Sequence, residues 1–283
     1  MAYSTCKAGM SAGGQVQDTI STEISTPLRQ ALVSRVIPQL IDTAVQVYAK
    51  KPLLPVHSVA LGRACVSSDH AAPEAYARFL LAQDFDIESL YLDTIPEAAR
   101  LFHDWWEVDD IDFVQVTSGI FRLEELVYSL SAEFVMGLQK TKPAASLTAL
   151  LLRPPGSQHT LGLLLLSQYF KRHGWQVFSA NQFSEQDMAL AVRSEWVDIL
   201  GFSVSEDRQV PVLKKTIASL RKQSGNPHML VMAGGPLLRL QPNLAELVGA
   251  DFSCLRADQA HTQALEKVQQ TLSHATVRPR REP

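Results

Sequence analysis

The chain has 283 residues, of which 46% are hydrophobic and 19% are charged. A chain of this length and composition can bury a core in one or two domains. The formal net charge of -3 provides no basic field for nucleic acid, so direct DNA binding across a broad surface is not expected.

Cysteine usage and the apolar runs indicate the environment of the protein. Cys6, Cys65 and Cys254 lie far apart and form no CxxC pair, which argues against a disulfide framework or a structural zinc site. Residues 1–19 have no basic start followed by an apolar block, so a secretory signal is not expected. The longest apolar runs, such as 161–166, are too short to span a bilayer. We therefore expect a cytoplasmic protein without a membrane association.

The first half of the chain carries helical signals. Residues 1–25 are rich in Ser, Thr and Gly and are expected to be a disordered lead-in. From Pro27 to Val45, apolar residues recur near i, i+4 and i+7, which predicts an amphipathic helix. Further helices are expected over Pro55–Val66, Ala71–Ala82, Ile87–Trp106 and Ile111–Leu138. Residues 26–140 are thus predicted to form an all-helical domain of the four-helix-bundle kind.

The stretch Lys140–Ala145, which contains Lys142-Pro143, is the predicted linker. Strands and helices alternate after it, in the region 145–275, and residues 276–283 form a tail. Strands are expected at Ser146–Leu152, Trp175–Phe178, Val197–Ser203, Met229–Ala233 and Asp251–Leu255, and helices at Thr160–Arg172, Glu185–Ser194, Val210–Gln223, Pro242–Val248 and Asp258–Leu272. This order predicts parallel βαβ units in an open, doubly wound, Rossmann-like sheet of the α/β class.

Ligands of doubly wound sheets bind outside the carboxyl ends of the strands. His159, Ser203 and the pair Gly234-Gly235 all follow predicted strands, so we expect them at one edge of the sheet. His159 follows a Pro-Pro-Gly turn and begins a helix, and imidazole is a good ligand for cobalt or iron. By position alone, however, His159 is more readily interpreted as a helix-start histidine that is bonded to solvent or to a loop.

The serine and glycine motifs also have plain structural interpretations. Ser203 and Ser205 present hydroxyls to a ligand, but strand-end serines often bond only their own turn. Gly234 and Gly235 allow a flat ligand to approach the backbone closely, but Gly-Gly-Pro is also an ordinary turn.

The combination of motifs is more specific than its parts. His159-x-x-Gly162, then Ser203-x-Ser205, then Gly234-Gly235 resembles the signature of the cobalamin-binding domain, which is Asp-x-His-x-x-Gly, Ser-x-Leu and Gly-Gly at similar separations. The resemblance implies that His159 is the lower cobalt ligand in place of the dimethylbenzimidazole of the cofactor. It also implies roles around the displaced nucleotide tail: Ser203 and Ser205 would bond it, and Gly162, Gly234 and Gly235 would make room for it.

The helical half adds a second resemblance. Trp106, Asp109, Phe113 and Val116-Thr117 are spaced as in the helical cap of corrinoid photoreceptors and their relatives. This implies that Trp106 packs over the upper face of the corrin. Trp105 and Trp106 diverge by about 100° on a helix, so one of them is expected to be simply core or surface.

Cap and binding domain together resemble, over 27–272, the AerR/PpaA group of regulators, which act on the photosynthesis-gene repressor of purple bacteria. The string Pro155–Gly162 is close to the form found in that group. Two departures from wider family patterns stand out. Ser157 occupies the position of the Asp that orients the imidazole in metabolic cobalamin enzymes, and Val116-Thr117 replaces the Glu-His of the adenosylcobalamin repressors.

The resemblance implies a light- or redox-responsive regulator, not an enzyme, that binds adenosylcobalamin or hydroxocobalamin and controls transcription through a repressor protein. Three alternatives remain. The first is a haem sensor that uses His159, because Ser157 in place of Asp suits iron as readily as cobalt. The second is a corrinoid methyl carrier of a methyltransferase system, and the third is a cofactor-free interaction module.

Overall fold

The computed structural model describes residues 51, 53–137, 147–179 and 184–275. The chain divides into two compact units, 1–49 and 50–283, and all described residues lie in the second. The predicted lead-in, the predicted helix from Pro27 to Val45, the linker Lys140–Ala145 and the tail 276–283 lie outside the described residues.

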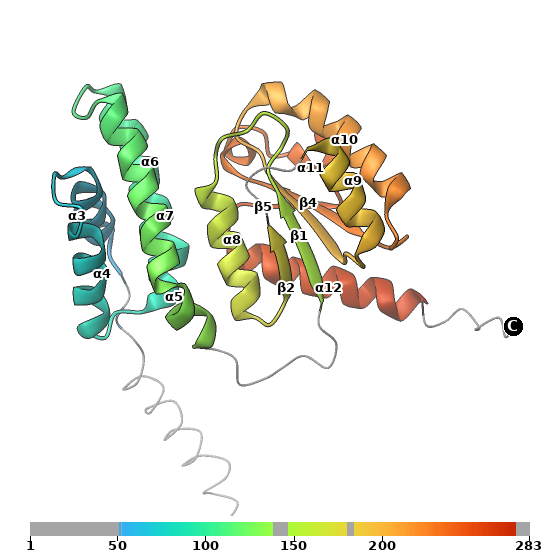
Figure 1. The fold of residues 1–283 in the computed structure, drawn as a ribbon, viewed down its shortest axis with the longest axis horizontal. Coiled ribbons are helices and arrows are strands. Elements are labelled where there is room, and N and C mark those ends of the chain that lie inside the picture. The colour runs from blue at the N-terminus through green and yellow to red at the C-terminus, as the bar shows by residue number, and fades with distance from the viewer. Residues whose placement is uncertain (1–50, 52, 138–146, 180–183, 276–283) are drawn as a thin grey trace, which may run out of the picture. The chain divides into compact units, whose positions relative to one another are not determined.

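The first part of the described chain is helical, as predicted (Figure 1). Its elements are α3 (Pro55–Val66), α4 (Ala72–Ala82), α5 (Ile87–Ser89), the π-helix η2 (Leu90–Thr94), α6 (Ile95–Glu107) and α7 (Phe113–Met136). Asp112 caps α7: its carboxylate accepts from Gln115 N–H at 2.7 Å, and the Gln115 side chain accepts from Asp112 N–H at 3.0 Å. The helix therefore begins at Phe113 and not at Ile111.

A π-helical turn interrupts the single helix that was expected over Ile87–Trp106. Ile95 N–H donates to the carbonyl oxygen of Leu90, five residues earlier. Pro96 follows directly and has no N–H, so the regular hydrogen-bond ladder is broken at this point. The widened turn lets the chain continue as α6 without a loop.

The second part is a parallel sheet with helices on both faces, as the alternation predicted. The described strands are β1 (Thr148–Leu152), β2 (Gln176–Ser179), β3 (Ile199–Ser203), β4 (Leu230–Gly234) and β5 (Phe252–Cys254), and they form one five-stranded sheet in the order β2-β1-β3-β4-β5. All of their pairings are parallel. The intervening helices are α8 (Leu161–Arg172), α9 (Glu185–Ser194), α10 (Val210–Gln223), α11 (Leu244–Val248) and α12 (Ala257–Ala275), with short 3-10 turns η3 (Asp207–Gln209) and η4 (Pro236–Arg239).

Alternate strand residues enter two different cores. Leu150 of β1 packs with residues of α9, α10 and α11, whereas its neighbour Leu151 packs with residues of α8 and α12. Every residue of β1 and β3 is buried, as expected for central parallel strands that are covered on both faces.

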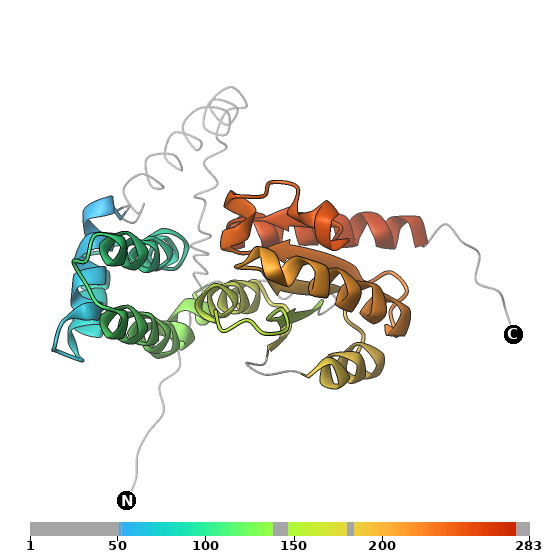
Figure 2. The ribbon, with the colours of Figure 1, turned by 90° about the horizontal axis from the view of Figure 1, so that it is seen from above.

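Helix α8 belongs to both parts. Leu163 and Phe170 face the sheet, whereas Leu161, Leu165 and Tyr169 join the core of the helical part. Helices α7 and α8 consequently lie side by side (Figure 1 and Figure 2). A shared apolar face of this kind links the position of the helical part to the start of α8.

The strand order places a switch point between β1 and β3. The chain leaves β1 toward β2 on one side and later returns to β3 on the other, so the loops after these two strands diverge. A crevice forms at such a point in doubly wound folds. The residues after Leu152 and Ser203 therefore border the expected ligand site.

Within the described residues, no helix combines the length and apolar content needed to cross a membrane.

Candidate functional site

The loop between β1 and α8 presents His159. Ser157 N–H donates to Pro154 O at 3.0 Å, and Gly156 adopts a φ of 80° at the turn, a backbone conformation that favours glycine. Ser157 is buried, and its hydroxyl accepts from His159 N–H at 3.4 Å. His159 itself is exposed, and among the described residues no hydrogen bond or ion pair ends on its ring. Its backbone is held while its imidazole is available to a ligand.

Three of the predicted residues converge beside this loop. A Cβ placed on Gly162 would lie 3.5 Å from the Ser203 hydroxyl oxygen, and a Cβ on Gly235 would lie 3.0 Å from the same atom. Gly235 has a φ of 101°, which favours glycine. The first turn of α8, the end of β3 and the residue after β4 thus meet at one hydroxyl, and the backbone packs closely around it.

Ser205 and Gly234 have different surroundings: among the described residues the Ser205 hydroxyl lacks a partner, whereas Gly234 packs against a neighbouring strand. The Ser205 hydroxyl is buried without a hydrogen-bond partner within the described part of the chain, so it retains bonding capacity for a ligand. A Cβ on Gly234 would lie 2.7 Å from the carbonyl oxygen of Cys254 on β5. The close approach of β5 therefore gives Gly234 a packing reason that does not involve a ligand.

Gln209 is a site neighbour that the sequence analysis missed. Its side-chain oxygen accepts from Ser205 N–H at 2.9 Å and from Glu206 N–H at 3.3 Å. Gln209 is buried, and its amide nitrogen has no partner among the described residues. The only sequence signal was its position one turn after Ser205, where a polar side chain can cap a helix start.

Trp105 and Trp106 separate as expected for adjacent helical residues. Trp105 packs against the helical core, with the Arg63 guanidinium 3.8 Å from its ring centroid. A Cβ on Gly62 would lie 2.9 Å from the Trp105 ring, so the indole occupies the space that this glycine leaves. Trp106 is 48% exposed. It is therefore the tryptophan that is free to contact a ligand.

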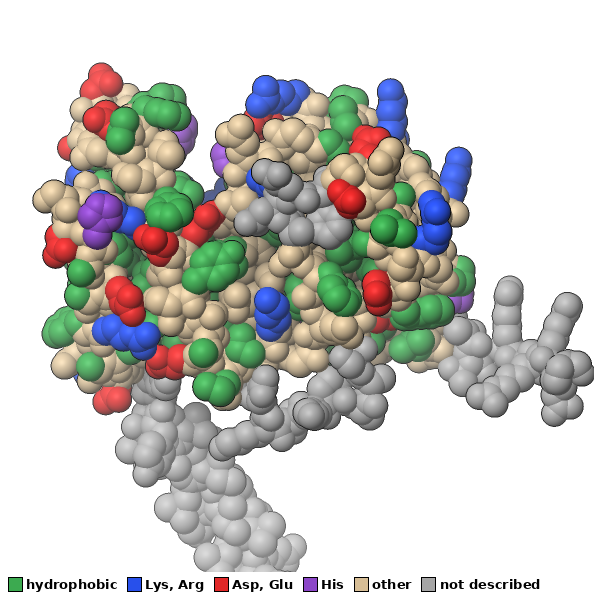
Figure 3. Space-filling model, in the orientation of Figure 1, with side chains coloured by type: hydrophobic (Ala, Val, Ile, Leu, Met, Phe, Trp, Pro, Cys, Tyr) green, Lys and Arg blue, Asp and Glu red, His purple; other side chains and the backbone are tan. Residues whose placement is uncertain are grey.

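Trp106 is part of an exposed apolar group at the turn between α6 and α7. This group, here called the apolar rim, consists of Trp106, Val108, Phe113 and Val114, of which the last three are each more than 70% exposed. In the space-filling view the surface is hollowed between the α6–α7 turn and the loop that follows β1 (Figure 3). The apolar rim and the His159 loop therefore flank a common hollow.

A contact between the two parts lies next to His159. The Thr160 hydroxyl donates to the carboxylate of Glu124 on α7, across 36 residues of sequence. Both residues are half-buried. Glu124 could not be identified from the sequence, because no local pattern marks a partner on a distant helix.

The comparisons with known proteins agree with this geometry. The family model described as the B12 binding domain matches residues 147–265. An uncharacterized 20.5 kDa protein in the bchF-crtJ intergenic region of Rhodobacter capsulatus is 32% identical over 169 residues, which are 59% of this chain and 85% of that protein.

A solved structure shares the fold. The Methanosarcina barkeri monomethylamine corrinoid protein superposes with a TM-score of 0.62 at 18% identity, over 73% of this chain and 95% of that chain. At this identity the likeness establishes the fold alone. The chain belongs to the same family as the Rhodobacter capsulatus protein, and its residues 147–265 match the model of the B12 binding domain.

Proposed function

We propose that this protein is a cobalamin-binding regulator that responds to light or to redox state and controls transcription by binding a repressor protein. The observation that carries the cofactor site is the convergence of Gly162, Ser203 and Gly235 at one edge of the sheet, which also bears the exposed ring of His159. This arrangement fits a ligand that has both a metal to be bound and a tail to be buried.

Each site residue receives a role under this proposal. His159 would hold the cobalt through an imidazole nitrogen, and Gly162 would leave room for the nucleotide tail beside the Ser203 hydroxyl, while Gly235 would shape the adjoining turn by packing against Val204. The unpartnered hydroxyl of Ser205 bonds a polar atom of the same tail. Gly234 shapes the same loop by admitting β5 closely.

Ser157 holds the backbone of this loop and supplies no charge to the ring. Its hydroxyl accepts from His159 N–H, where the resemblance leads us to expect a carboxylate that would orient and charge an imidazole. Without that carboxylate, His159 is a weaker donor to the metal. We infer that the lower ligand exchanges more readily than in proteins that have the Asp.

The regulatory part of the proposal depends on the helical part. Bound cobalamin would supply a light- and redox-sensitive cobalt centre on the side away from His159. Trp106 would cover that side, because it is exposed and belongs to the apolar rim that flanks the hollow. A change at the upper face would then displace the apolar rim and alter the surface offered to the repressor.

The proposal assigns no catalytic turnover to this chain. The gene of the Rhodobacter capsulatus relative lies between bchF and crtJ, which favours a role connected with those genes. The net charge of -3 favours a protein partner over direct contact with DNA. A methyl carrier is the second candidate, and methyl transfer from the methylated cofactor to a thiol acceptor with candidate partner proteins would support it.

Absorption spectroscopy tests the cofactor assignment. The purified protein is mixed separately with hydroxocobalamin, adenosylcobalamin and haem, passed through a desalting column and measured before and after illumination. We expect both corrinoids to be retained, and a spectral change in the light for adenosylcobalamin. A Soret band without corrinoid retention would overturn the proposal in favour of a haem sensor.

Two histidine variants localise the metal ligand. His159→Ala should lose the spectral signature of imidazole coordination and much of the retention. His228→Ala is the matched control, because His228 is also exposed but lies before β4, at the amino ends of the strands. Equal spectra for both variants and the wild type would contradict the role of His159. Binding of the purified photosynthesis-gene repressor, compared in the dark and in the light, tests the regulatory step.

A further inference from the structure

We infer that Glu124 is a positioning residue through which the helical part controls the loop of the proposed cobalt ligand. The inference rests on the proposed function, since it takes His159 as the lower ligand. It adds a residue that lies outside the cobalamin-binding domain and that no motif of that domain contains. Glu124 is proposed to act on the metal only through Thr160.

The contact involves the residue next to His159. The Thr160 hydroxyl donates to a Glu124 carboxylate oxygen, and Thr160 O accepts from Leu164 N–H at 2.9 Å in the first turn of α8. On the other side, Ser157 holds His159 N–H. The backbone at His159 is therefore fixed from two directions, once by its own loop and once by α7.

Helix α7 also carries part of the apolar rim. Phe113 and Thr117 precede Glu124 by 11 and 7 residues, so both lie within about 20° of it around an ideal helix. Phe113, a member of the apolar rim, is 71% exposed and lies about 16 Å from Glu124 along the axis. One face of one helix therefore carries both a rim residue and the residue that holds the ligand loop.

This arrangement provides a mechanical connection between the two faces of the proposed site. A helix of 24 residues moves as a rigid element over this distance. Any shift of its first turns is transmitted to Glu124, and the hydrogen bond to Thr160 transfers it to the backbone at His159. By reciprocity, the state of the lower ligand biases the position of α7.

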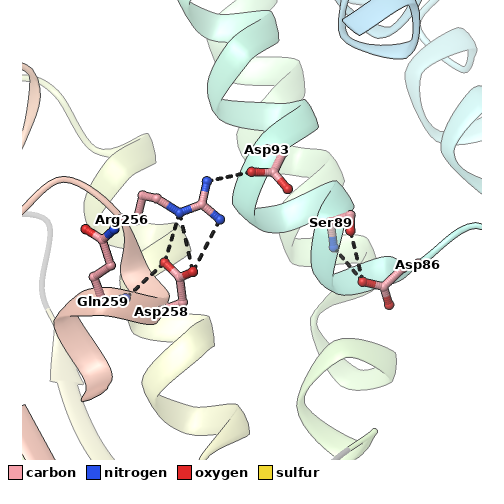
Figure 4. Close-up of polar contacts among 6 residues, drawn as sticks. All are labelled: Asp86, Ser89, Asp93, Arg256, Asp258 and Gln259. Carbon is pink, nitrogen blue, oxygen red and sulfur yellow. Dashed lines mark hydrogen bonds and ion pairs between the residues drawn. The ribbon is translucent and has the colours of Figure 1, made fainter. Parts of the chain in front are cut away.

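Other contacts hold the two parts together without Glu124. The buried guanidinium of Arg172 bonds Phe134 O and pairs with Glu88 at 3.3 Å. Directly before α12, Arg256 bridges Asp93 and Asp258, with the Asp93 contact at 2.6 Å (Figure 4). Removal of the Glu124 carboxylate should therefore leave the helical part attached, and a variant tests positioning and not assembly.

The experiment uses the full-length protein and hydroxocobalamin. Glu124→Ala removes the acceptor, Glu124→Gln keeps an acceptor oxygen, and Glu125→Ala is the control on the adjacent, exposed position of the same helix. We measure the absorption spectrum that reports imidazole coordination and the rate of hydroxocobalamin dissociation. Loss of a partner bonded directly to a metal-bound histidine commonly weakens metal binding about 10–100-fold. Glu124 acts through Thr160, one residue away, so we expect the lower end of that range, about 10-fold faster dissociation, for Glu124→Ala.

The pattern across the variants separates positioning from a general loss of structure. Glu124→Gln should restore most of the wild-type spectrum, and Glu125→Ala should leave it unchanged. Thr160→Val should match Glu124→Ala, and the double variant should be no worse than either, because both changes remove the same contact.

The failure of this inference is distinguishable from the failure of the proposed function. If the wild type retains no hydroxocobalamin, or if His159→Ala leaves its spectrum unchanged, the proposed function is wrong. If His159→Ala loses the signature while Glu124→Ala behaves like Glu125→Ala, the ligand stands and the positioning role of Glu124 is refuted.

Discussion

Substitution of Gly235 by alanine should destabilise the cofactor-free protein strongly. Gly235 has φ 101° and ψ 176°, a region that is essentially restricted to glycine and costs other residues about 1–3 kcal/mol. The new Cβ would also lie 2.5 Å from Val204 O and 2.6 Å from Val204 N, and crowding of this kind costs about 1–3 kcal/mol more. We expect a loss of about 2–6 kcal/mol, or at least about 4 °C in Tm for a domain of this size.

Gly249→Ala is the matched control for this substitution. Gly249 has a φ of 77°, but no heavy atom lies within 4 Å of the Cβ position, so only the left-handed backbone penalty of about 1–2 kcal/mol applies. Urea unfolding of both cofactor-free variants separates strain from crowding. Equal destabilisation of the two variants would refute the close approach of Gly235 to Val204, and with it the packing around Ser203.

Two further predictions concern buried charged and titratable groups in the cofactor-free protein. Glu88→Ala should lower the free energy of unfolding by about 2–3 kcal/mol in a urea assay, because it leaves the buried Arg172 guanidinium without its acid partner. Glu97→Ala removes an exposed pair and should cost less than about 1 kcal/mol in the same assay. Similar losses for the two variants would contradict the argument that burial makes the Arg172 pair more costly to break. Burial, together with the nearby His173, lowers the pKa of His261 from 6.5 to about 4. Between these two pH values the unfolded chain binds a proton on His261 that the folded chain does not bind. The free energy of unfolding should therefore fall as the pH falls from 6.5 toward 4. His261→Phe should flatten that dependence in urea titrations between pH 7 and pH 5, and an unchanged slope would exclude His261 as its source.

The elements were predictable where their signals are local. The alternation of apolar runs and amphipathic stretches predicted Pro55–Val66, Glu185–Ser194 and Val210–Gln223 with the bounds that the structure has. The π-helical turn before Pro96 was missed, because a single widened turn of five residues is too short to change the apolar periodicity of the surrounding helix.

The sequence predicted which edge of the sheet bears the site, but it did not predict the contacts between the site residues. Parallel strands end at one edge in any order, so His159, Ser203 and Gly235 could be assigned to that edge from the sequence. Their convergence required β1 and β3 to be neighbours, which brings the Ser203 hydroxyl beside Gly162. Strand order depends on which crossovers the packed helices permit.

The sequence by itself determined the helical and α/β parts, the parallel sheet and the sheet edge that bears His159. These features follow from the spacing of apolar residues and from turn chemistry along the chain. The tertiary structure alone decided which tryptophan is packed, since Trp105 fills the space at Gly62 and leaves Trp106 exposed. It also decided that Glu124 reaches Thr160. Contacts of this kind join residues far apart in the chain, and their geometry is set by the packing of α7 on α8, for which no local pattern exists.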